Sequence, residues 1–338
     1  MTSVIHISKS ALRHNLRQFK KLLQPETKIM AMVKANAYGH GQNLVVPTIA
    51  SQVDFFGVAT LTEAQQIRNL KIQTPILVCA PIDIPDIPKA VSQNISICIP
   101  SLEYLKQVSR YPLKVHLKIN TGMNRLGIST NEIREAIKII QNSSLSLDGV
   151  YTHFHSPESK SVTQKQLELF KTCVSITKKS FPNVLVHAAK TAAIIDYPDS
   201  HFDMVRLGIG LYGLWQQPKN LKPVLSWTTQ VTQSRKVERG ETIGYSATHQ
   251  FKKSSFTAVL PVGYYDGLDR GLSNTPSFVG RISMNFSTIQ TPKLLKPGTT
   301  IDLIGKDLST QALASRLDTI PYEVITRLNP LISRILVD

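Results

Sequence analysis

The sequence predicts an α/β protein in which an N-terminal (β/α)8 barrel of the TIM type is followed by a mostly antiparallel β domain. Three observations support this. Short apolar runs recur eight times before Tyr212, segments with helical spacing separate them, and the helical segments then give way to short alternating runs. We therefore place the barrel at residues 1–221 and the β domain at residues 222–338, a length that allows each domain its own core.

The eight predicted strands are rich in Val, Ile and Leu, as expected for strands buried on both faces. They span residues 27–34, 54–60, 74–80, 94–100, 113–120, 147–154, 183–189 and 203–210. Several of the helical segments between them open with Ser or Thr followed by Glu, which is typical of a helix start, and a further helix is predicted at residues 8–22. A doubly wound open sheet is the alternative, but no GxGxxG follows the first strand, and eight units are enough to close a barrel.

The β domain is predicted from residues 222–305, where short alternating runs are punctuated by Gly, Pro and Asn. The runs include VLSWTTQVTQSRKV, SFTAVLPVGYYDG and SFVGRISMNFSTI. Alternation of this kind is typical of antiparallel strands with one buried face. A C-terminal tail that contains YEVITRL completes the domain.

Composition excludes several classes of function. The formal net charge is +16, from 39 Lys and Arg against 23 Asp and Glu, but the basic residues are dispersed, which favours a solvated basic surface over nucleic-acid binding. No apolar stretch is long enough for a membrane span and the N-terminus does not resemble a signal peptide, so we expect a cytoplasmic protein. Cys79, Cys98 and Cys173 are widely separated and indicate reduced thiols, and no metal-ligand spacing occurs, so no metal is expected.

Polar residues gather at the ends of the predicted barrel strands, where barrel enzymes place their active sites. They are Lys34, Lys118, Asn120, His153, His187, Lys190, Thr191 and Arg206. Lys34 is the most unusual, because it ends an apolar run and is followed by small residues in ANAYGHG. A buried ammonium is costly unless it is paired or loses its proton, and a Schiff base with a carbonyl cofactor removes that cost.

Longer motifs carry a specific resemblance. VKANAYGHG at 33–41, KINTGMNRLGIS at 118–129, GETIGYSATH at 240–249 and IPYEV at 320–324 resemble the signatures of the alanine racemase family. Further matches are GVYTHF, VHAAKTAA, VRLGIGLYG, PVGYYDG and GRISMN, so the resemblance runs nearly end to end. It implies a barrel followed by a β domain, a Schiff base between Lys34 and pyridoxal 5'-phosphate, and interconversion of L- and D-alanine to supply peptidoglycan synthesis.

The resemblance also implies how the cofactor is held. Arg206 would lie at the pyridine nitrogen, which stays unprotonated because an arginine donates a hydrogen bond and does not give up its proton. The phosphate would lie after the seventh and eighth strands, a common position in barrels. The implied phosphate contacts are Tyr38, Thr191, Gly208, Ile209 and Tyr322.

Racemisation needs a base on each face of the substrate Cα. The resemblance assigns these roles to Lys34 and Tyr245, with His153 hydrogen-bonded to Tyr245 and linked onward to Arg206. Tyr245 lies in the predicted β domain, and in this family it reaches the barrel of a second subunit. A homodimer with shared active sites is therefore implied.

The substrate carboxylate would be met by Arg125 and the backbone N–H of Met284. Lys118 lies seven residues before Arg125, as in the family, where this lysine is often carbamylated and so carries a negative charge. The sequence departs from the family pattern at four positions: Asn120, Asn124, Lys190 and Asn285.

These departures leave open a racemase of broader or different amino-acid preference, such as serine. A related fold serves decarboxylases of basic amino acids, but Arg206 stands where they offer an acid and no Cys follows Cys173. A cofactor carrier with a single barrel would have neither the β domain nor Tyr245.

Overall fold

The computed structural model of the chain describes residues 3–276 and 278–338. Contacts divide it into two units, which we call the barrel unit (Leu12–Ala37 and Val45–Leu221) and the β unit (Met1–Ala11, Tyr38–Leu44 and Lys222–Asp338). This division differs from a single boundary at residue 221. The reason is that the N-terminal strand β1 (Ser3–Ser8), which we did not predict, pairs with strands of the β unit.

The eight predicted barrel strands are confirmed. Within the described residues they are β2 (Lys28–Met32), β3 (Phe55–Val58), β4 (Ile76–Val78), β5 (Ser96–Ile99), β6 (Lys114–Asn120), β8 (Ser146–Tyr151), β9 (Leu185–Lys190) and β10 (Met204–Leu207). Each pairs in parallel with its neighbours, and β10 pairs with β2, so the sheet closes on itself. A short strand, β7 (Ile128–Ser129), adds to β6. The carboxyl ends of the eight strands therefore share one mouth.

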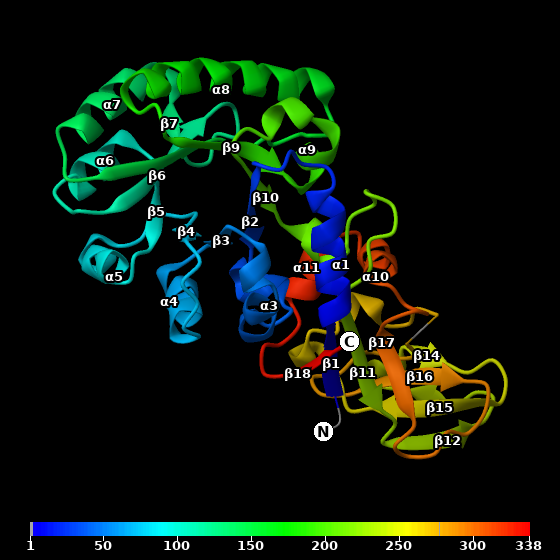
Figure 1. Cartoon of the computed structure of the whole chain (residues 1–338). Coiled ribbons are helices and arrows are strands. Elements are labelled where there is room, and N and C mark those ends of the chain that lie inside the picture. Colours follow the sequence, from blue (N-terminus) through cyan, green and yellow to red (C-terminus); the bar gives the residue numbers. More distant parts are fainter. Residues whose placement is uncertain (1–2, 277) are drawn as a thin grey trace. The chain divides into compact units, whose positions relative to one another are not determined.

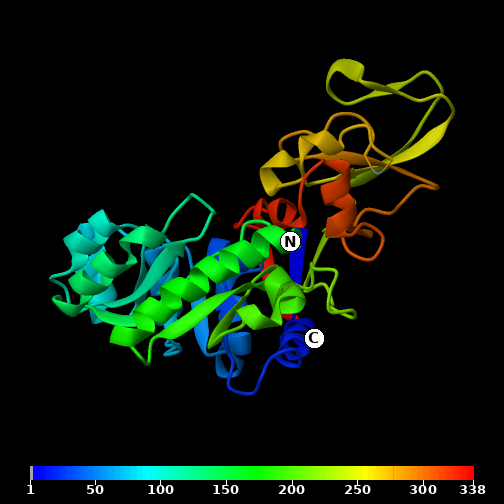
Figure 2. The ribbon, with the colours of Figure 1, turned by 90° about the horizontal axis from the view of Figure 1, so that it is seen from above.

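Helices alternate with these strands (Figure 1). They are α1 (Lys9–Lys20), α3 (Gln42–Ile49), α4 (Leu61–Asn69), α5 (Ile87–Ser92), α6 (Leu102–Val108), α7 (Ile133–Gln141), α8 (Lys160–Ser180) and α9 (Thr191–Asp196). In α7 the buried positions follow helical spacing, so one face packs inward. Figure 2 shows α8, with 21 residues, as one continuous helix. No helix in the described parts of the chain is long and apolar enough to cross a membrane.

Arg68 near the end of α4 ties neighbouring loops of the barrel unit together. Its guanidinium donates hydrogen bonds of 2.8–3.0 Å to four backbone carbonyls, those of Ile72, Thr74, Gln93 and Asn94. These acceptors come from the loops before β4 and β5, at the amino ends of the strands. The planar guanidinium of Arg68 therefore stabilises the end of the barrel opposite its mouth.

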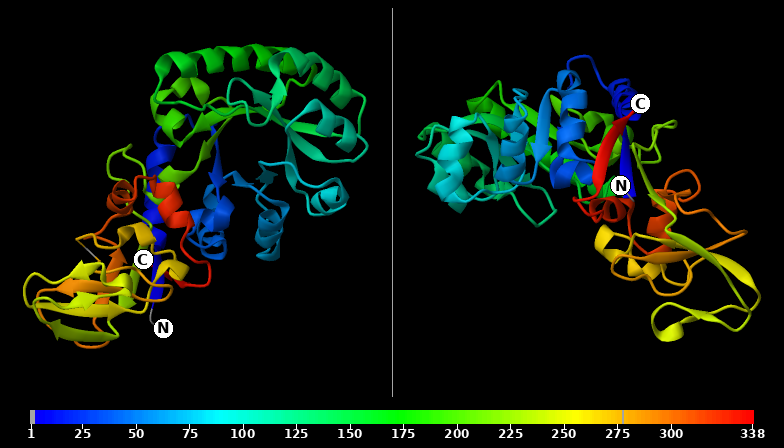
Figure 3. Two further views of the ribbon diagram at one scale, coloured as in Figure 1. Left: turned by 180° about the vertical axis from the view of Figure 1, so that it is seen from behind. Right: turned by 90° about the horizontal axis from the view of Figure 1, so that it is seen from below.

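The β unit is mostly antiparallel, as predicted. One sheet has the order β17 (Thr300–Ile304), β11 (Leu225–Gln230), β1 and β18 (Ser333–Val337), in which only β1 and β18 run parallel. A second contains β12 (Gln233–Val237), β15 (Ser255–Leu260) and β16 (Ser287–Thr291), visible as adjacent yellow to orange strands in the left view of Figure 3. The remaining elements are β13 (Thr242–Ile243), β14 (His249–Gln250), α10 (Thr310–Arg316) and α11 (Pro321–Thr326).

Candidate active site

Lys34 follows the last residue of the first barrel strand, Met32 of β2, by two positions and begins an unusual turn, α2 (Lys34–Tyr38). The φ angles of Ala35, Asn36, Ala37 and Tyr38 all lie between 52° and 54°, so the turn is left-handed. Each such residue other than glycine costs about 1–2 kcal/mol, because its Cβ lies close to the following carbonyl oxygen. Surrounding contacts must therefore hold this turn. The Lys34 side chain is half-buried, and its amine has no hydrogen bond or ion pair with any residue that the structure describes.

Arg206 on β10 is the central charge of the barrel mouth. It is 5% exposed, and its two terminal nitrogens donate to Thr152 O at 2.7 Å, Ala188 O at 2.8 Å and His187 O at 3.2 Å. They also donate to the Nδ1 atoms of His187 at 2.8 Å and His153 at 3.4 Å. Among the described residues no carboxylate forms an ion pair with Arg206. No atom of these residues accepts a hydrogen bond from its Nε–H. One donor of a rigid guanidinium therefore remains available.

The histidines behind Arg206 have defined tautomers. Because an arginine only donates, His187 must accept at Nδ1 and carry its proton on Nε2, which donates to Nδ1 of His116 at 2.9 Å. Both imidazoles are fully buried, and Tyr151 stacks on His187 with ring centroids 4.7 Å apart. Gly149 on β8 leaves space for the imidazole of His116, since a Cβ at position 149 would lie 2.2 Å from Nδ1 of His116. The chain Arg206–His187–His116 thus holds the guanidinium in one orientation.

The buried hydrogen-bonded histidines predict that the protein loses stability in mild acid. Burial, and then the positive charge of Arg206, lowers the pKa of His116 to about 3 and also lowers the pKa of His187. In the unfolded chain both rings take up protons below a pKa of about 6.5, so the unfolded state binds up to two more protons. The free energy of unfolding should then fall by about 1.4 kcal/mol per pH unit for each histidine as the pH drops below that value. Urea unfolding between pH 7 and pH 5 measures this slope.

The control for this slope is His116→Gln, whose amide oxygen can accept the His187 proton in the same space. The variant should lose stability less steeply below pH 6.5 by the contribution of one histidine, about 1.4 kcal/mol per pH unit. Identical slopes for the two proteins would contradict a neutral, buried His116.

Lys118 on β6 is also buried without an acid. It is 5% exposed, and its ammonium lies 5.7 Å from the ring centroid of Tyr151. Burial lowers the pKa of Lys118; the thiol of Cys98 raises it, and the positive charges of Arg125 and Arg206 lower it further. Burial therefore shifts the balance of Lys118 toward the neutral amine, which is the nucleophilic form.

Thr191 begins α9 and organises the loop after β10. Its Oγ1 accepts hydrogen bonds from the backbone N–H of Gly208 at 3.1 Å and of Gly210 at 3.4 Å. A side chain at Gly210 would lie 2.4 Å from the ring of Phe19. A hydroxyl and closely spaced backbone donors are the groups that bind a phosphate.

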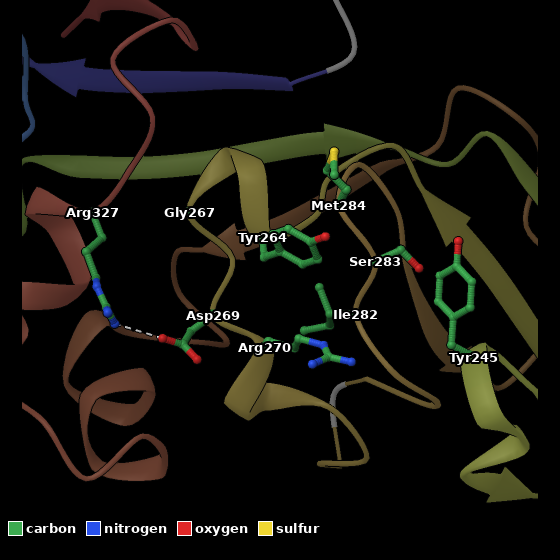
Figure 4. A pocket seen from close by; sticks show the side chains of 9 residues that line it. All are labelled: Tyr245, Tyr264, Gly267, Asp269, Arg270, Ile282, Ser283, Met284 and Arg327. Atoms are coloured by element: carbon green, nitrogen blue, oxygen red, sulfur yellow. Dashed lines mark hydrogen bonds and ion pairs between the residues drawn. The ribbon is translucent and has the colours of Figure 1, made fainter.

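The β unit carries the other candidate residues, in two places. The rings of Tyr38 and Tyr322 lie 6.1 Å apart. Tyr245 and Met284, which are 69% and 55% exposed, line a cavity of about 760 Å3 together with Tyr264 (Figure 4). The N–H of Met284 donates to no acceptor among the described residues, whereas its carbonyl accepts from Tyr265 N at 3.0 Å.

Comparisons with known proteins match both units. The family model described as the N-terminal domain of alanine racemase covers residues 7–216, and the C-terminal domain of the same family covers residues 224–336. The chain belongs to the alanine racemase family. The alanine racemase of Streptococcus suis is 35% identical over 98% of this chain and 97% of its own length, and that of Leptospira interrogans is 34% identical over 100% and 96%.

Solved structures agree with this alanine racemase assignment. The Bacillus anthracis alanine racemase with bound L-Ala-P has a TM-score of 0.94 at 30% identity, covering 100% of this chain and 95% of the other. The Bartonella henselae alanine racemase, which has covalently bound pyridoxal phosphate, has a TM-score of 0.90 at 27% identity, covering both chains fully. The fold predicted from the sequence and the activity of an amino-acid racemase are confirmed.

The predicted site residues of this alanine racemase fall in both units. The barrel unit holds Lys34, Lys118, Arg125, His153, Thr191, Arg206, Gly208 and Ile209. The β unit holds Tyr38, Tyr245, Met284 and Tyr322. Arg206 contacts His153 directly, as the resemblance implied. The predicted hydrogen bond between His153 and Tyr245 stays a prediction. Within the described residues no cluster of His, Cys, Asp or Glu has the size of a metal site.

Two departures from the family pattern turn out to be one structural feature. Asn120 and Asn124 hydrogen-bond side chain to side chain at 2.9 Å, and Oδ1 of Asn120 also accepts from Asn124 N at 3.0 Å. Asn124 has φ 53°, a left-handed conformation in which Asn is well tolerated and Gly is usual. The pair therefore closes the loop that carries Arg125.

Sequence reasoning missed three residues of the site. His116 and Tyr151 lie in the interior of apolar runs, where a polar residue is more often a satisfied core residue. Glu63 stands in LTEAQQIRNL, which we interpreted only as a helix start. The alternation of strand residues, which points His116 into the barrel two positions before Lys118, is the signal that could have found the first of them.

Proposed function

We propose that this racemase acts on alanine with pyridoxal 5'-phosphate bound to Lys34. The observation that carries the proposal is the buried Arg206 guanidinium, held by five hydrogen bonds with its Nε–H unused at the mouth where Lys34 also lacks a partner. A pyridine nitrogen accepts one such hydrogen bond, and an aldehyde bonds an unpaired amine, so the residues fit the cofactor. Bound there, the cofactor would supply the electron withdrawal that acidifies the α-hydrogen of an amino acid.

The phosphate of the cofactor is assigned to Thr191, Gly208 and Ile209 in the barrel unit and to the phenols of Tyr38 and Tyr322 in the β unit. The loop after β10 supports this, because Gly208 N and Gly210 N donate to Thr191 Oγ1 and fix the hydroxyl, which keeps its own O–H to donate to a phosphate oxygen. Lys190 directly precedes α9, where its charge adds to the attraction for an anion. The Bartonella henselae relative with covalently bound pyridoxal phosphate supports the same cofactor.

Lys34 and Tyr245 are the two bases in this proposal, one for each face of the substrate Cα. His153 accepts from Arg206 at Nδ1, so its neutral ring keeps the proton on Nε2. Burial, and then Arg206, lowers the pKa of His153, which keeps the ring in that neutral form. Its Nε2–H would stabilise the phenolate of Tyr245 when that oxygen takes a proton from L-alanine.

Arg125 and the free N–H of Met284 are proposed to bind the substrate carboxylate. Lys118 would orient Arg125 as a carbamate: its neutral amine forms an N–C bond with carbon dioxide and releases a proton, which turns a repelling cation into an anion. The lowered pKa of Lys118, caused first by burial, supports that reaction.

A homodimer completes the site in this proposal. Tyr245, Tyr264, Tyr265, Met284 and Phe286 are all at least 44% exposed on the β unit. Exposed large apolar side chains gathered near one cavity favour an interface with another protein surface. We propose that this surface meets the barrel mouth of a second copy, so that each site takes Lys34 from one subunit and Tyr245 from its partner.

The proposed setting is the cytoplasm, where D-alanine would serve peptidoglycan synthesis; the free thiols of Cys79, Cys98 and Cys173 suit a reducing compartment. A preference for another small amino acid, such as serine, is the second candidate. The observation that favours it is the departure from the family pattern at Asn120 and Asn285, which stand where an acid is usual, together with the extra cation of Lys190.

The proposal predicts the position of the cofactor and the preferred substrate. Borohydride reduction of the protein reconstituted with pyridoxal 5'-phosphate should fix the pyridoxyl group on Lys34, as read by peptide mass mapping. Turnover measured on a panel of amino acids should be fastest for alanine. A label on Lys190 would mean that the wrong lysine was chosen, and faster turnover of serine would favour the second candidate.

A further inference from the structure

The peptide bonds on both sides of Lys34 are held by hydrogen bonds. Before it, the carbonyl of Val33 accepts from Ala37 N at 2.9 Å, and Val33 N, one peptide further back, donates to Gly57 O of β3 at 2.9 Å. After it, Ala35 N donates to Oε1 of Glu63 at 2.6 Å. The Cα of Lys34 therefore lies between two anchored peptide planes, one held within the turn and the other by the start of α4, and these planes set the direction in which its side chain leaves the backbone.

Glu63 supplies the side chain that binds the Ala35 amide, and its carboxylate joins three segments. While Oε1 binds the first amide of the left-handed turn, Oε2 accepts from Ala59 N at 2.8 Å and from Thr60 N at 3.3 Å. The backbone N–H of Glu63 in turn donates to Oγ1 of Thr60 at 3.2 Å, which completes a capping box at α4. The carboxylate thus links the end of β2 to the end of β3 and the first turn of α4.

The amide of Ala35 is a position where an acceptor matters. Ala35 has φ 52° and ψ 52°, so the chain leaves Lys34 in a sparsely populated conformation that surrounding contacts must hold. A carboxylate accepting from a backbone N–H is a charge-assisted hydrogen bond, stronger than one to a neutral acceptor. Without it, the turn could relax toward right-handed conformations, and the Lys34 amine would be displaced.

We propose that Glu63 is a positioning residue for Lys34, which aims the amine at the cofactor by fixing the Ala35 amide. This rests on the proposed function, in which Lys34 bonds pyridoxal 5'-phosphate and transfers a proton. Glu63 itself touches neither cofactor nor substrate in this proposal. The bond from Ala35 to the Glu63 carboxylate is therefore separate from the bonds by which Glu63 caps α4.

Two variants separate positioning from capping. Glu63→Ala removes the Ala35 acceptor and half of the capping box, whereas Thr60→Ala removes the other half and leaves the bond from Ala35 in place. Cofactor affinity should be measured by titrating the apoprotein with pyridoxal 5'-phosphate, and stability by urea unfolding. We expect Glu63→Ala to weaken cofactor binding and to lower kcat by about 10-fold each, the loss expected for a hydrogen bond to a charged group. Thr60→Ala should stay within about twofold of the unmodified protein in both.

Glu63→Gln is a second variant that keeps one acceptor oxygen and should fall between the two. Equal losses in Glu63→Ala and Thr60→Ala would show that Glu63 acts only through α4, and normal affinity and kcat in Glu63→Ala would also overturn the proposal. Borohydride labelling of the unmodified protein distinguishes the underlying assignment. A label away from Lys34 refutes the proposed function, whereas a label on Lys34 with unaffected Glu63 variants refutes only the positioning role.

Discussion

Replacing Tyr245 with Phe is expected to reduce racemisation by about 100-fold or more, because general base catalysis contributes 10²–10⁴-fold and the ring without its hydroxyl cannot accept a proton. The loss should be asymmetric. In D2O, Lys34 should still exchange the α-hydrogen of D-alanine, whereas exchange into L-alanine should disappear. NMR of each enantiomer measures this directly. Tyr265→Phe is the matched control, since Tyr265 is 54% exposed on the same unit and is assigned no part in proton transfer. Undiminished exchange of both enantiomers would contradict the two-base assignment.

Mixed dimers test whether Tyr245 acts in the partner's site. Lys34→Ala and Tyr245→Phe proteins should each be inactive alone. After subunit exchange, half of the dimers are mixed, and one of the two sites in each would regain both bases, so about a quarter of normal activity should return. If Lys34 and Tyr245 of the same chain worked together, no mixed dimer would contain an intact site and no activity would return.

Much of the fold could be predicted because the barrel strands are buried on both faces and so form nearly continuous apolar runs. All eight appear at the predicted places, and six lie within the predicted ranges; β8 begins one residue earlier, at Ser146, and β9 ends one residue later, at Lys190. The structure ends several of them earlier than predicted, and the last, predicted at 203–210, stops at Leu207. The strand β1 could not be recognised in the same way. Its partners, Leu225–Gln230 and Ser333–Val337, lie more than 200 residues away, and no local pattern shows that SVIHIS pairs with them.

The site was predictable where strand position alone fixes it. Lys34 and Arg206 follow apolar runs, so the barrel topology places both at the mouth. The left-handed turn after Lys34 was not predictable, because ANAY contains no glycine and its conformation is held by tertiary contacts such as the Glu63 carboxylate. The pairing of His116 with His187 was hidden for a related reason: the residues are 71 positions apart, and only the closed sheet brings their strands to the two sides of β8.

Replacing Arg206 with Lys should cost both stability and activity. The ammonium keeps the charge but lacks the planar fork, so it cannot reach the two histidine nitrogens and three carbonyls that the guanidinium binds. Buried acceptors left without donors should lower the free energy of unfolding by about 2–4 kcal/mol. Racemisation should fall by about 100-fold or more, because a preorganised donor at the reacting centre is lost. Urea unfolding and steady-state kinetics measure the two effects.

The matched control is Arg68→Lys. Arg68 also uses its planar fork on the backbone, donating to four carbonyls at the amino ends of the barrel strands, far along the strands from the mouth. The residues that carry these carbonyls are half-buried or exposed, so the replacement should lower the free energy of unfolding by about 1–2 kcal/mol. The kcat of the folded protein should stay within about twofold, because none of the partners of Arg68 belongs to the site. If both variants lost stability equally and both kept full kcat, Arg206 would be a structural arginine, and the cofactor assignment built on its free Nε–H would lose its main support.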